Sequence, residues 1–226
     1  MTGSDPTPAR RLDAPAFHRN HRAISAVLAR HLSGATGDAV EIGSGSGQHV
    51  VAFAADFPGL VWWPSDPLSV HRASIDAWRL EAGAANIRPA VAIDAAADWR
   101  LGEPGLPPGR DLAAIVCINV LHVAPWAVAE GLLAGAGRHL ARHGRLFVYG
   151  PFTRNGVHTA PSNAAFDASL RAADPAWGVR DVARIETAAR DRGLRLLEIA
   201  DMPANNLTLV LAPGDRAETK PEAAGM

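Results

Sequence analysis

The chain has 226 residues and a formal net charge of −1; 48% of its residues are hydrophobic and 20% are charged. These values are ordinary for a globular protein of one domain. The chain has no long run of one charge, which argues against a broad nucleic-acid-binding surface or contact with an anionic membrane, so we expect neither partner. No apolar window of ~18 residues occurs, so we expect no membrane span.

The single cysteine, Cys117, excludes a disulfide framework within the chain. The lack of cysteine pairs suits a reducing compartment, and we expect a cytoplasmic protein without a secretory signal. Segment 1–15 is polar, and segment 213–226 is rich in proline, glycine, alanine and charge, so both are predicted to be flexible. One domain is therefore expected over 16–212.

Short apolar runs alternate with segments of helical periodicity along most of the chain. The first periodic segment, 19–32, is predicted to be a helix. The predicted strands are 39–42, 61–63, 88–93, 112–118, 145–149, 194–200 and 207–211. The further predicted helices are 48–56, 70–82, 126–140, 163–173 and 179–192.

This alternation predicts an α/β fold, Rossmann-like, with a seven-stranded, mostly parallel sheet and helices on both faces. The last two strands have no helix between them, so we expect a hairpin and one antiparallel strand. A polar loop is expected at 150–162. Ligands of such sheets bind at the carboxyl ends of the strands, so the polar residues that follow each strand are the candidate site.

A glycine-rich loop follows the first predicted strand, with Gly43, Gly45 and Gly47 in alternate positions. Glycines let the backbone turn tightly and approach a ligand closely. The dinucleotide fingerprint needs a sixth-position glycine, which is Gln48 here, so an NAD(P)-dependent oxidoreductase is disfavoured. Glycines at these positions, with the acid Glu41 two residues before the first, are typical of methyltransferase motif I. A simple strand-to-helix turn is the alternative.

Polar residues after the next strands extend this interpretation. Asp66 could accept both ribose hydroxyls of the cofactor, or could cap a turn before Pro67. Asp94, followed by Ala95, could accept the adenine amino group, or could cap a loop. Asn119 follows the most apolar strand and is expected beneath the sulfonium.

We therefore expect S-adenosylmethionine as the cofactor and S-adenosylhomocysteine as its product. The expected cofactor-binding residues are Asn20, Glu41, Gly43, Ser44, Gly45, Gly47, Gln48, Asp66, Pro67, Asp94, Ala95, Asn119, Val120 and His122.

Several segments within 19–211 resemble the DUF938 family, which includes the eukaryotic methyltransferase-like 26 proteins. These segments are 40–49, 63–67, 119–122, 149–152, 161–167 and 202–207. The resemblance implies a class I methyltransferase fold and binding of S-adenosylmethionine, and it implies no settled substrate. It also favours a contact of Asn20, which follows an arginine as in the family, with the cofactor's carboxylate; capping of the first helix is the alternative.

The polar segment 149–167 follows the fifth strand and is expected to fold over the methyl group. The expected substrate-binding residues are Tyr149, Phe152, Asn155, His158, Ser162, Asn163, Asn205 and Asn206. The candidate catalytic residues are His158, His122, Tyr149 and Asp167. Of the two candidate bases, His158 is preferred, because His122 could instead pack against the cofactor or cap the next helix. The histidines show no metal-site spacing, so no metal is expected.

These observations favour a small-molecule methyltransferase that transfers a methyl group in line to an acceptor held under the 150–167 loop. A protein or RNA methyltransferase would need an open basic groove beside the cofactor. In a non-catalytic cofactor-binding module, His158 and Asp167 would be structural. The sequence leaves open the acceptor, its reacting atom and whether the chain forms a homodimer.

Overall fold

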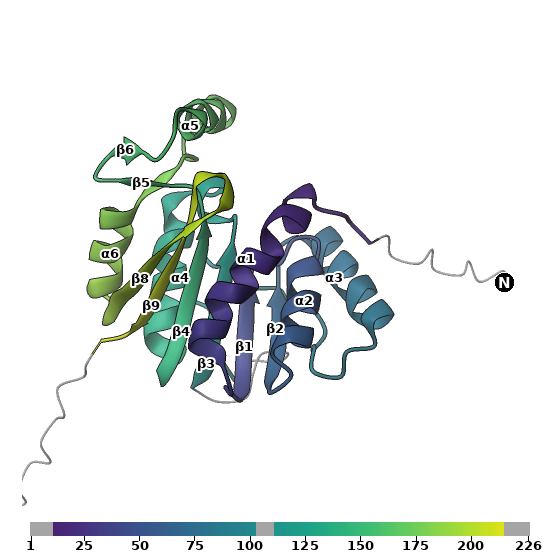
Figure 1. The fold of residues 1–226 in the computed structure, drawn as a ribbon. Coiled ribbons are helices and arrows are strands. Elements are labelled where there is room, and N and C mark those ends of the chain that lie inside the picture. Colours follow the sequence, from purple (N-terminus) through teal and green to yellow (C-terminus); the bar gives the residue numbers. More distant parts are fainter. Residues whose placement is uncertain (1–10, 103–110, 215–226) are drawn as a thin grey trace, which may run out of the picture.

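The computed structural model describes residues 11–102 and 111–214, and a mixed α/β sheet forms its centre (Figure 1). The sheet has six strands in the order β2-β1-β3-β4-β9-β8. Their bounds are β2 Leu60–Ser65, β1 Gly37–Ile42, β3 Leu112–Ile118, β4 Leu140–Gly150, β9 Asn206–Pro213 and β8 Leu194–Met202. β9 is antiparallel to both of its neighbours, whereas β2, β1, β3 and β4 are mutually parallel.

The predicted count of seven strands is wrong for the described residues, because segment 88–93 does not form a regular strand. It lies beside β2 and makes two isolated parallel bridges, Trp62 with Ile87 and Ser65 with Val91. Pro64 in β2 has no N–H group, so it cannot donate a ladder hydrogen bond to this segment. Ala90 N donates to the Asp76 side chain instead of to β2. The pairing slips by one residue between the two bridges. The periodicity of apolar residues does not reveal that a backbone donor is missing.

Helices cover both faces of the sheet (Figure 1). Three of them pack on one face through a cluster that includes Leu28, Phe53, Ile75 and Trp62. These are α1 Pro15–Leu32, α2 Gln48–Asp56 and α3 Ser69–Ala82. On the other face lie α4 Trp126–His139 and α6 Val182–Arg190. Their apolar stripes bury side chains against the central strands.

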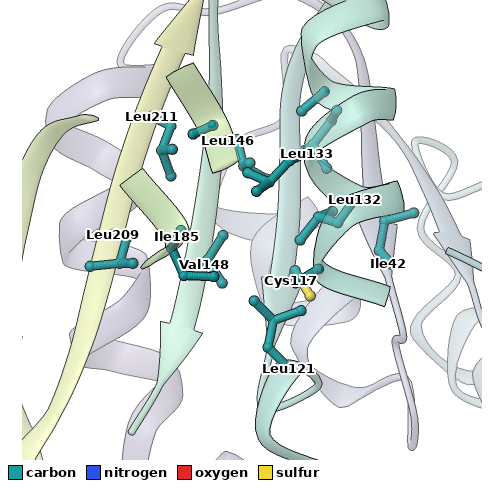
Figure 2. Close-up of a cluster of buried hydrophobic side chains, with 14 of the residues drawn as sticks. Ile42, Cys117, Leu121, Leu132, Leu133, Leu146, Val148, Ile185, Leu209 and Leu211 are labelled. Carbon is teal, nitrogen blue, oxygen red and sulfur yellow. The ribbon is translucent and has the colours of Figure 1, made fainter. Parts of the chain in front are cut away.

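The core between α4, α6 and the sheet is built from branched aliphatic side chains (Figure 2). Leu132 and Leu133 of α4 and Ile185 of α6 pack with Cys117 and Leu146, and all five are at most 1% exposed. Cys117 therefore lies inside the core.

The expected polar loop 150–162 is instead ordered into a small second sheet. β5 Phe152–Arg154 pairs with β6 Val157–His158 in a hairpin and, in parallel, with β7 Arg180–Asp181. The Asp181 carboxylate accepts hydrogen bonds from Thr153 Oγ1 and Gly156 N, both at 2.7 Å. This sheet and α5 Pro161–Ala173 lie beyond the carboxyl ends of the parallel strands, beside the turn between β8 and β9 (Figure 1).

The structure differs from the expected flexible segment 1–15 at its last residues. α1 begins at Pro15 rather than at residue 19, and the residues before it pack on α2 and α3. Leu12 N donates to Ser74 Oγ at 2.8 Å, and Ala14 N donates to Gln48 Oε1 at 2.7 Å. Residues 1–10 and 215–226 lie outside the described residues. No helix in the described part of the chain is long and apolar enough to cross a membrane.

Replacement of Leu132 by alanine should destabilise the fold by about 2–5 kcal/mol, because it leaves a cavity in a fully buried cluster. The free energy of unfolding in urea measures the effect. Leu80→Ala is the matched control, because Leu80 is also in a helix but is 68% exposed, and its loss should stay within about 0.5 kcal/mol. Similar losses in the two variants would contradict the described core.

Candidate functional site

The glycine loop between β1 and α2 has left-handed backbone at Gly43, Gly45 and Gly47, with φ of +69°, +55° and +92°. The neighbours of the first and last glycine exclude any side chain. A Cβ on Gly43 would lie 2.6 Å from Val120 Cγ2, and one on Gly47 would lie 2.7 Å from Ile75 Cα. A Cβ on Gly45 would meet nothing within 4 Å. The middle of the loop therefore faces free space in which a ligand can lie.

Asp66 follows β2 and turns its carboxylate towards this loop. Its Oδ2 accepts a hydrogen bond from Gly45 N at 3.0 Å, and its Oδ1 accepts one from Leu68 N at 2.9 Å. His71 Nδ1 also lies 3.0 Å from Oδ1. Asp66 is 4% exposed, whereas Pro67 is exposed. The structure thus brings the expected ribose acceptor to the glycine loop.

Glu41, two residues before the loop, is a buried carboxyl group. It is 1% exposed, and its Oε2 has no hydrogen-bond partner among the described residues. Burial raises its pKa to about 8; a hydrogen bond from Ser44 opposes this rise, and the charge of Asp66 adds to it. At neutral pH Glu41 is mostly protonated, and it offers an unpaired polar atom beneath the loop.

Two further residues that are expected to bind the cofactor, Gln48 and Asp94, have hydrogen-bond partners within the protein. The Gln48 side chain binds the segment before α1: its Oε1 accepts from Ala14 N, and its Nε2 donates to Asp13 Oδ1 at 2.7 Å. Asp94 is exposed, and its Oδ1 accepts a hydrogen bond from Ala96 N at 2.9 Å, which is the loop-capping arrangement. Ala95 is buried. Contact of Asp94 and Ala95 with adenine stays a prediction.

A cavity of about 370 Å³ lies next to the ends of β3 and β4. It is partly open to solvent, and the first half of α1, α5 and the turn between β8 and β9 border it. Its lining residues are Ala16, Arg19, Asn20, Asn119, His122, Tyr149, Pro151, Asn163, Phe166, Pro203, Ala204 and Asn206.

Six of the residues expected to contact ligands line this cavity. They are Asn20, Asn119, His122, Tyr149, Asn163 and Asn206. Asn119 has left-handed backbone, with φ of +58°, and its N–H donates to the Tyr149 carbonyl at 2.9 Å. This bond ties the ends of β3 and β4 together at the cavity floor.

Other expected substrate residues do not line the cavity. Phe152 is 2% exposed and belongs to the core. Asn155 lies in the exposed turn between β5 and β6, and Ser162 is exposed on α5. The Asn205 side chain is exposed, while its carbonyl accepts a hydrogen bond from Asn163 Nδ2 at 3.0 Å. Asn205 thus orients a cavity residue through its backbone.

The two candidate bases occupy different environments. His158 does not line the cavity, and its Nε2 lies 3.6 Å from Asp167 Oδ2. Asp167 also accepts hydrogen bonds from Arg171 Nε and, at 2.7 Å, from Val179 N. Through these bonds Asp167 joins α5 to the segment before β7. The structure therefore does not bring His158 and Asp167 together with Tyr149 at the cavity.

His122 lines the cavity from the short 3-10 helix η1 Leu121–Val123. Burial lowers its pKa to about 4, and the positive charge of Arg180 acts in the same direction. Its ring packs edge-on against Phe166 at 5.6 Å. Arg180 fixes this helix because its guanidinium donates to the carbonyls of Leu121 and Ala124. His122 is therefore an uncharged imidazole held in place at neutral pH.

Sequence reasoning missed half of the cavity lining: Ala16, Arg19, Pro151, Phe166, Pro203 and Ala204. Two of these residues lie in segments that the sequence analysis had singled out. Arg19 directly precedes Asn20, and Phe166 lies in the family-like segment 161–167. No acidic side chain forms an ion pair with Arg19 in the described ranges. In the same ranges, no group of three or more potential ligands could hold a metal ion.

Gly47→Ala should destabilise the protein more than Gly45→Ala, although both positions have left-handed backbone. Alanine at Gly45 adds only the backbone cost of about 1 kcal/mol. At Gly47 the new methyl group must also displace the α3 backbone at Ile75, which should add at least about 1 kcal/mol. Urea unfolding of both variants measures the difference. Equal losses would contradict the close contact of the loop with α3.

Glu41→Gln should flatten the fall of stability with rising pH between about pH 4.5 and pH 8. The pKa of Glu41 rises from 4.5 to about 8 on folding, so its contribution is complete below 4.5 and is lost as the pH rises through 8. The wild-type melting temperature should fall more between about pH 5 and pH 8 than that of Glu41→Gln. Glu198→Gln is the control, because the pKa of Glu198 is lowered. Parallel curves for wild type and Glu41→Gln would refute a protonated Glu41.

Comparison with known proteins agrees with this architecture. A family described as a protein of unknown function (DUF938) matches residues 11–212. The solved structure of the mitomycin 7-O-methyltransferase MmcR matches with a TM-score of 0.68 and 17% identity, over 85% of this chain and 53% of that chain. For CalO1, a methyltransferase in calicheamicin biosynthesis in its SAH-bound form, the values are 0.63, 21%, 85% and 55%.

An O-methyltransferase family protein from Burkholderia thailandensis matches with a TM-score of 0.71 and 14% identity, over 87% of this chain and 57% of that chain. This chain thus spans somewhat more than half the length of these three structures. At these identities the likeness concerns the fold. The chain has a methyltransferase fold, and its match over residues 11–212 shows that it belongs to the DUF938 family.

Proposed function

We propose that this chain is an S-adenosylmethionine-dependent methyltransferase that acts on a small molecule. The observation that carries the proposal is a partly open cavity of about 370 Å³, where asparagine amides and an imidazole stand among apolar groups, beside a glycine loop of the motif I kind. Small-molecule sites typically have volumes of ~300–1,000 Å³. Structural neighbours include O-methyltransferases, among them a mitomycin 7-O-methyltransferase, and this supports an oxygen atom as the methyl acceptor.

The residues around the loop fit the cofactor. The free space at Gly45, the unpaired Glu41 Oε2 and the Asp66 carboxylate provide a backbone approach and two polar groups for a ribose and an amino-acid moiety. Asn20 and Asn119 would hold the end nearer the cavity. When bound, S-adenosylmethionine supplies an electrophilic methyl group on a positively charged sulfur.

The cavity residues would orient the acceptor and handle its proton. Methyl transfer needs the acceptor atom in line with the bond that breaks, and positioning supplies much of the rate enhancement. Asn163 and Asn206 present amide groups, and Phe166 supplies an apolar wall. Because His122 is uncharged at neutral pH and lines this cavity, we assign it, rather than His158, the task of accepting a hydrogen bond from the acceptor's hydroxyl group.

Binding of S-adenosylhomocysteine, measured by isothermal titration calorimetry, tests the cofactor half of the proposal. Asp66→Asn should weaken binding at least about tenfold, because an amide nitrogen cannot accept a hydrogen bond from a ribose hydroxyl. Asp38→Asn is the matched control: Asp38 lies at the opposite end of β1, where it accepts from Trp63 Nε1, and its affinity should match the wild type.

If titration of concentrated wild-type protein with S-adenosylhomocysteine gives no binding heat, the proposal is contradicted. Equal affinity in wild type and Asp66→Asn would show that the ligand binds elsewhere. For the transfer half, tritium-labelled S-adenosylmethionine is incubated with small hydroxylated compounds, and label should move to an extractable product. Label found only on protein or RNA would favour a macromolecular acceptor.

A further inference from the structure

Tyr149 is the only tyrosine in the chain, and its hydroxyl group lies at the cavity. The phenol oxygen accepts a hydrogen bond from Asn206 Nδ2 at 3.0 Å. Burial raises the Tyr149 pKa, and the amides of Asn20 and Asn206 oppose this rise, as groups that donate to the phenol oxygen do. A phenol oxygen has two acceptor positions and one proton. With Asn206 bonded to this oxygen and the Asn20 amide acting on it as a donor, the hydroxyl group is left to donate its own hydrogen bond elsewhere.

Within residues 11–102 and 111–214, no protein group receives the Tyr149 proton. The orientation of the Asn20 amide explains why. His49 Nε2 lies 2.9 Å from Asn20 Oδ1, so the protonated Nε2 of a neutral imidazole donates to this oxygen. The amide nitrogen of Asn20 is then left to face the phenol. If the amide were reversed, its oxygen would take the phenol proton.

His49 is suited to this task because it is buried and uncharged. It is 9% exposed and packs between Phe17 and Phe53, with ring distances of 5.1 and 5.8 Å. Burial lowers its pKa to about 4, and the charge of His21 acts in the same direction. His49 does not line the cavity, so it can act there only through Asn20.

We propose that Tyr149 donates a hydrogen bond to a negatively polarised oxygen of the methyl acceptor, and that His49 is the positioning residue that keeps this donor available by orienting Asn20. The proposal rests on the proposed function and adds a substrate class to it: small molecules with a carboxylate, phenolate or carbonyl oxygen. Arg19, a cation on the same lining without an acidic partner in the described ranges, favours the anionic members of this class.

Because Tyr149 is the only tyrosine, protein labelled with ¹³Cζ-tyrosine gives one NMR resonance, which reports its protonation and hydrogen bonds without any activity assay. His49→Phe keeps the aromatic packing and removes the donor, so the Asn20 amide can reverse. The titration midpoint of Tyr149 should then rise by about one pH unit. His49→Gln restores an N–H donor and should return the midpoint to the wild-type value.

His21→Phe is the matched control, because His21 also stacks on Phe17, and its Nδ1 bonds the Phe17 carbonyl rather than the Asn20 side chain. Its midpoint should equal that of the wild type. If Tyr149 titrates above the pH at which the fold survives, its chemical shift at pH 7 gives the same comparison. Coincident values for wild type and His49→Phe, or failure of His49→Gln to restore them, would overturn the role of His49.

The substrate class is tested by adding benzoate or benzylamine to the wild-type protein saturated with S-adenosylhomocysteine. Benzoate presents carboxylate oxygens and should move the Tyr149 resonance, whereas benzylamine, of similar shape and opposite charge, should not. No movement with benzoate, or equal movement with both, would overturn the assigned class. Since the ligand-free His49 comparison needs no cofactor, it can fail or succeed independently of the calorimetric test of the proposed function.

Discussion

The contact between the glycine loop and its two neighbours is the constraint on which the candidate site depends. Gly47 lies against the α3 backbone at Ile75, and Gly43 lies against the side chain of Val120 after β3. These contacts leave no room for a Cβ, so they set how closely β1, β3 and α3 approach. The Asp66 carboxylate also accepts a hydrogen bond from Gly45 N. The loop is therefore fixed by packing on both sides, while its middle stays open towards solvent.

Burial controls the charge of the groups around this loop and the cavity. An ionised group in an apolar environment loses hydration, so its neutral form is favoured. Glu41 is held protonated and His122 is held deprotonated for this reason, and the buried Arg180 keeps its charge by donating to backbone carbonyls. Glu41 and His122 are thus neutral hydrogen-bonding groups at neutral pH.

The sequence predicted best the parts of the fold that depend on local periodicity. The bounds of β3 and α2 match the expected ones, because long apolar runs and helical spacing determine these elements. The predicted strand 88–93 is wrong because Pro64 of the neighbouring strand lacks a ladder donor and the pairing slips by one residue, which is a pairwise effect. The strands of two and three residues in 152–158 carry too few residues for any period.

The same distinction explains which site residues could be found. Residues that directly follow parallel strands, such as Asp66 and Asn119, meet at one sheet edge whatever the details of packing. The position of His158 depended on how residues 150–162 fold, and there the hairpin with β5 holds it away from the cavity lining. His49 could not be recognised at all, because its role arises from a side-chain contact between α1 and α2. Strand order thus predicts where a ligand binds, whereas the hydrogen-bonding direction of the lining groups depends on contacts between elements far apart in the chain.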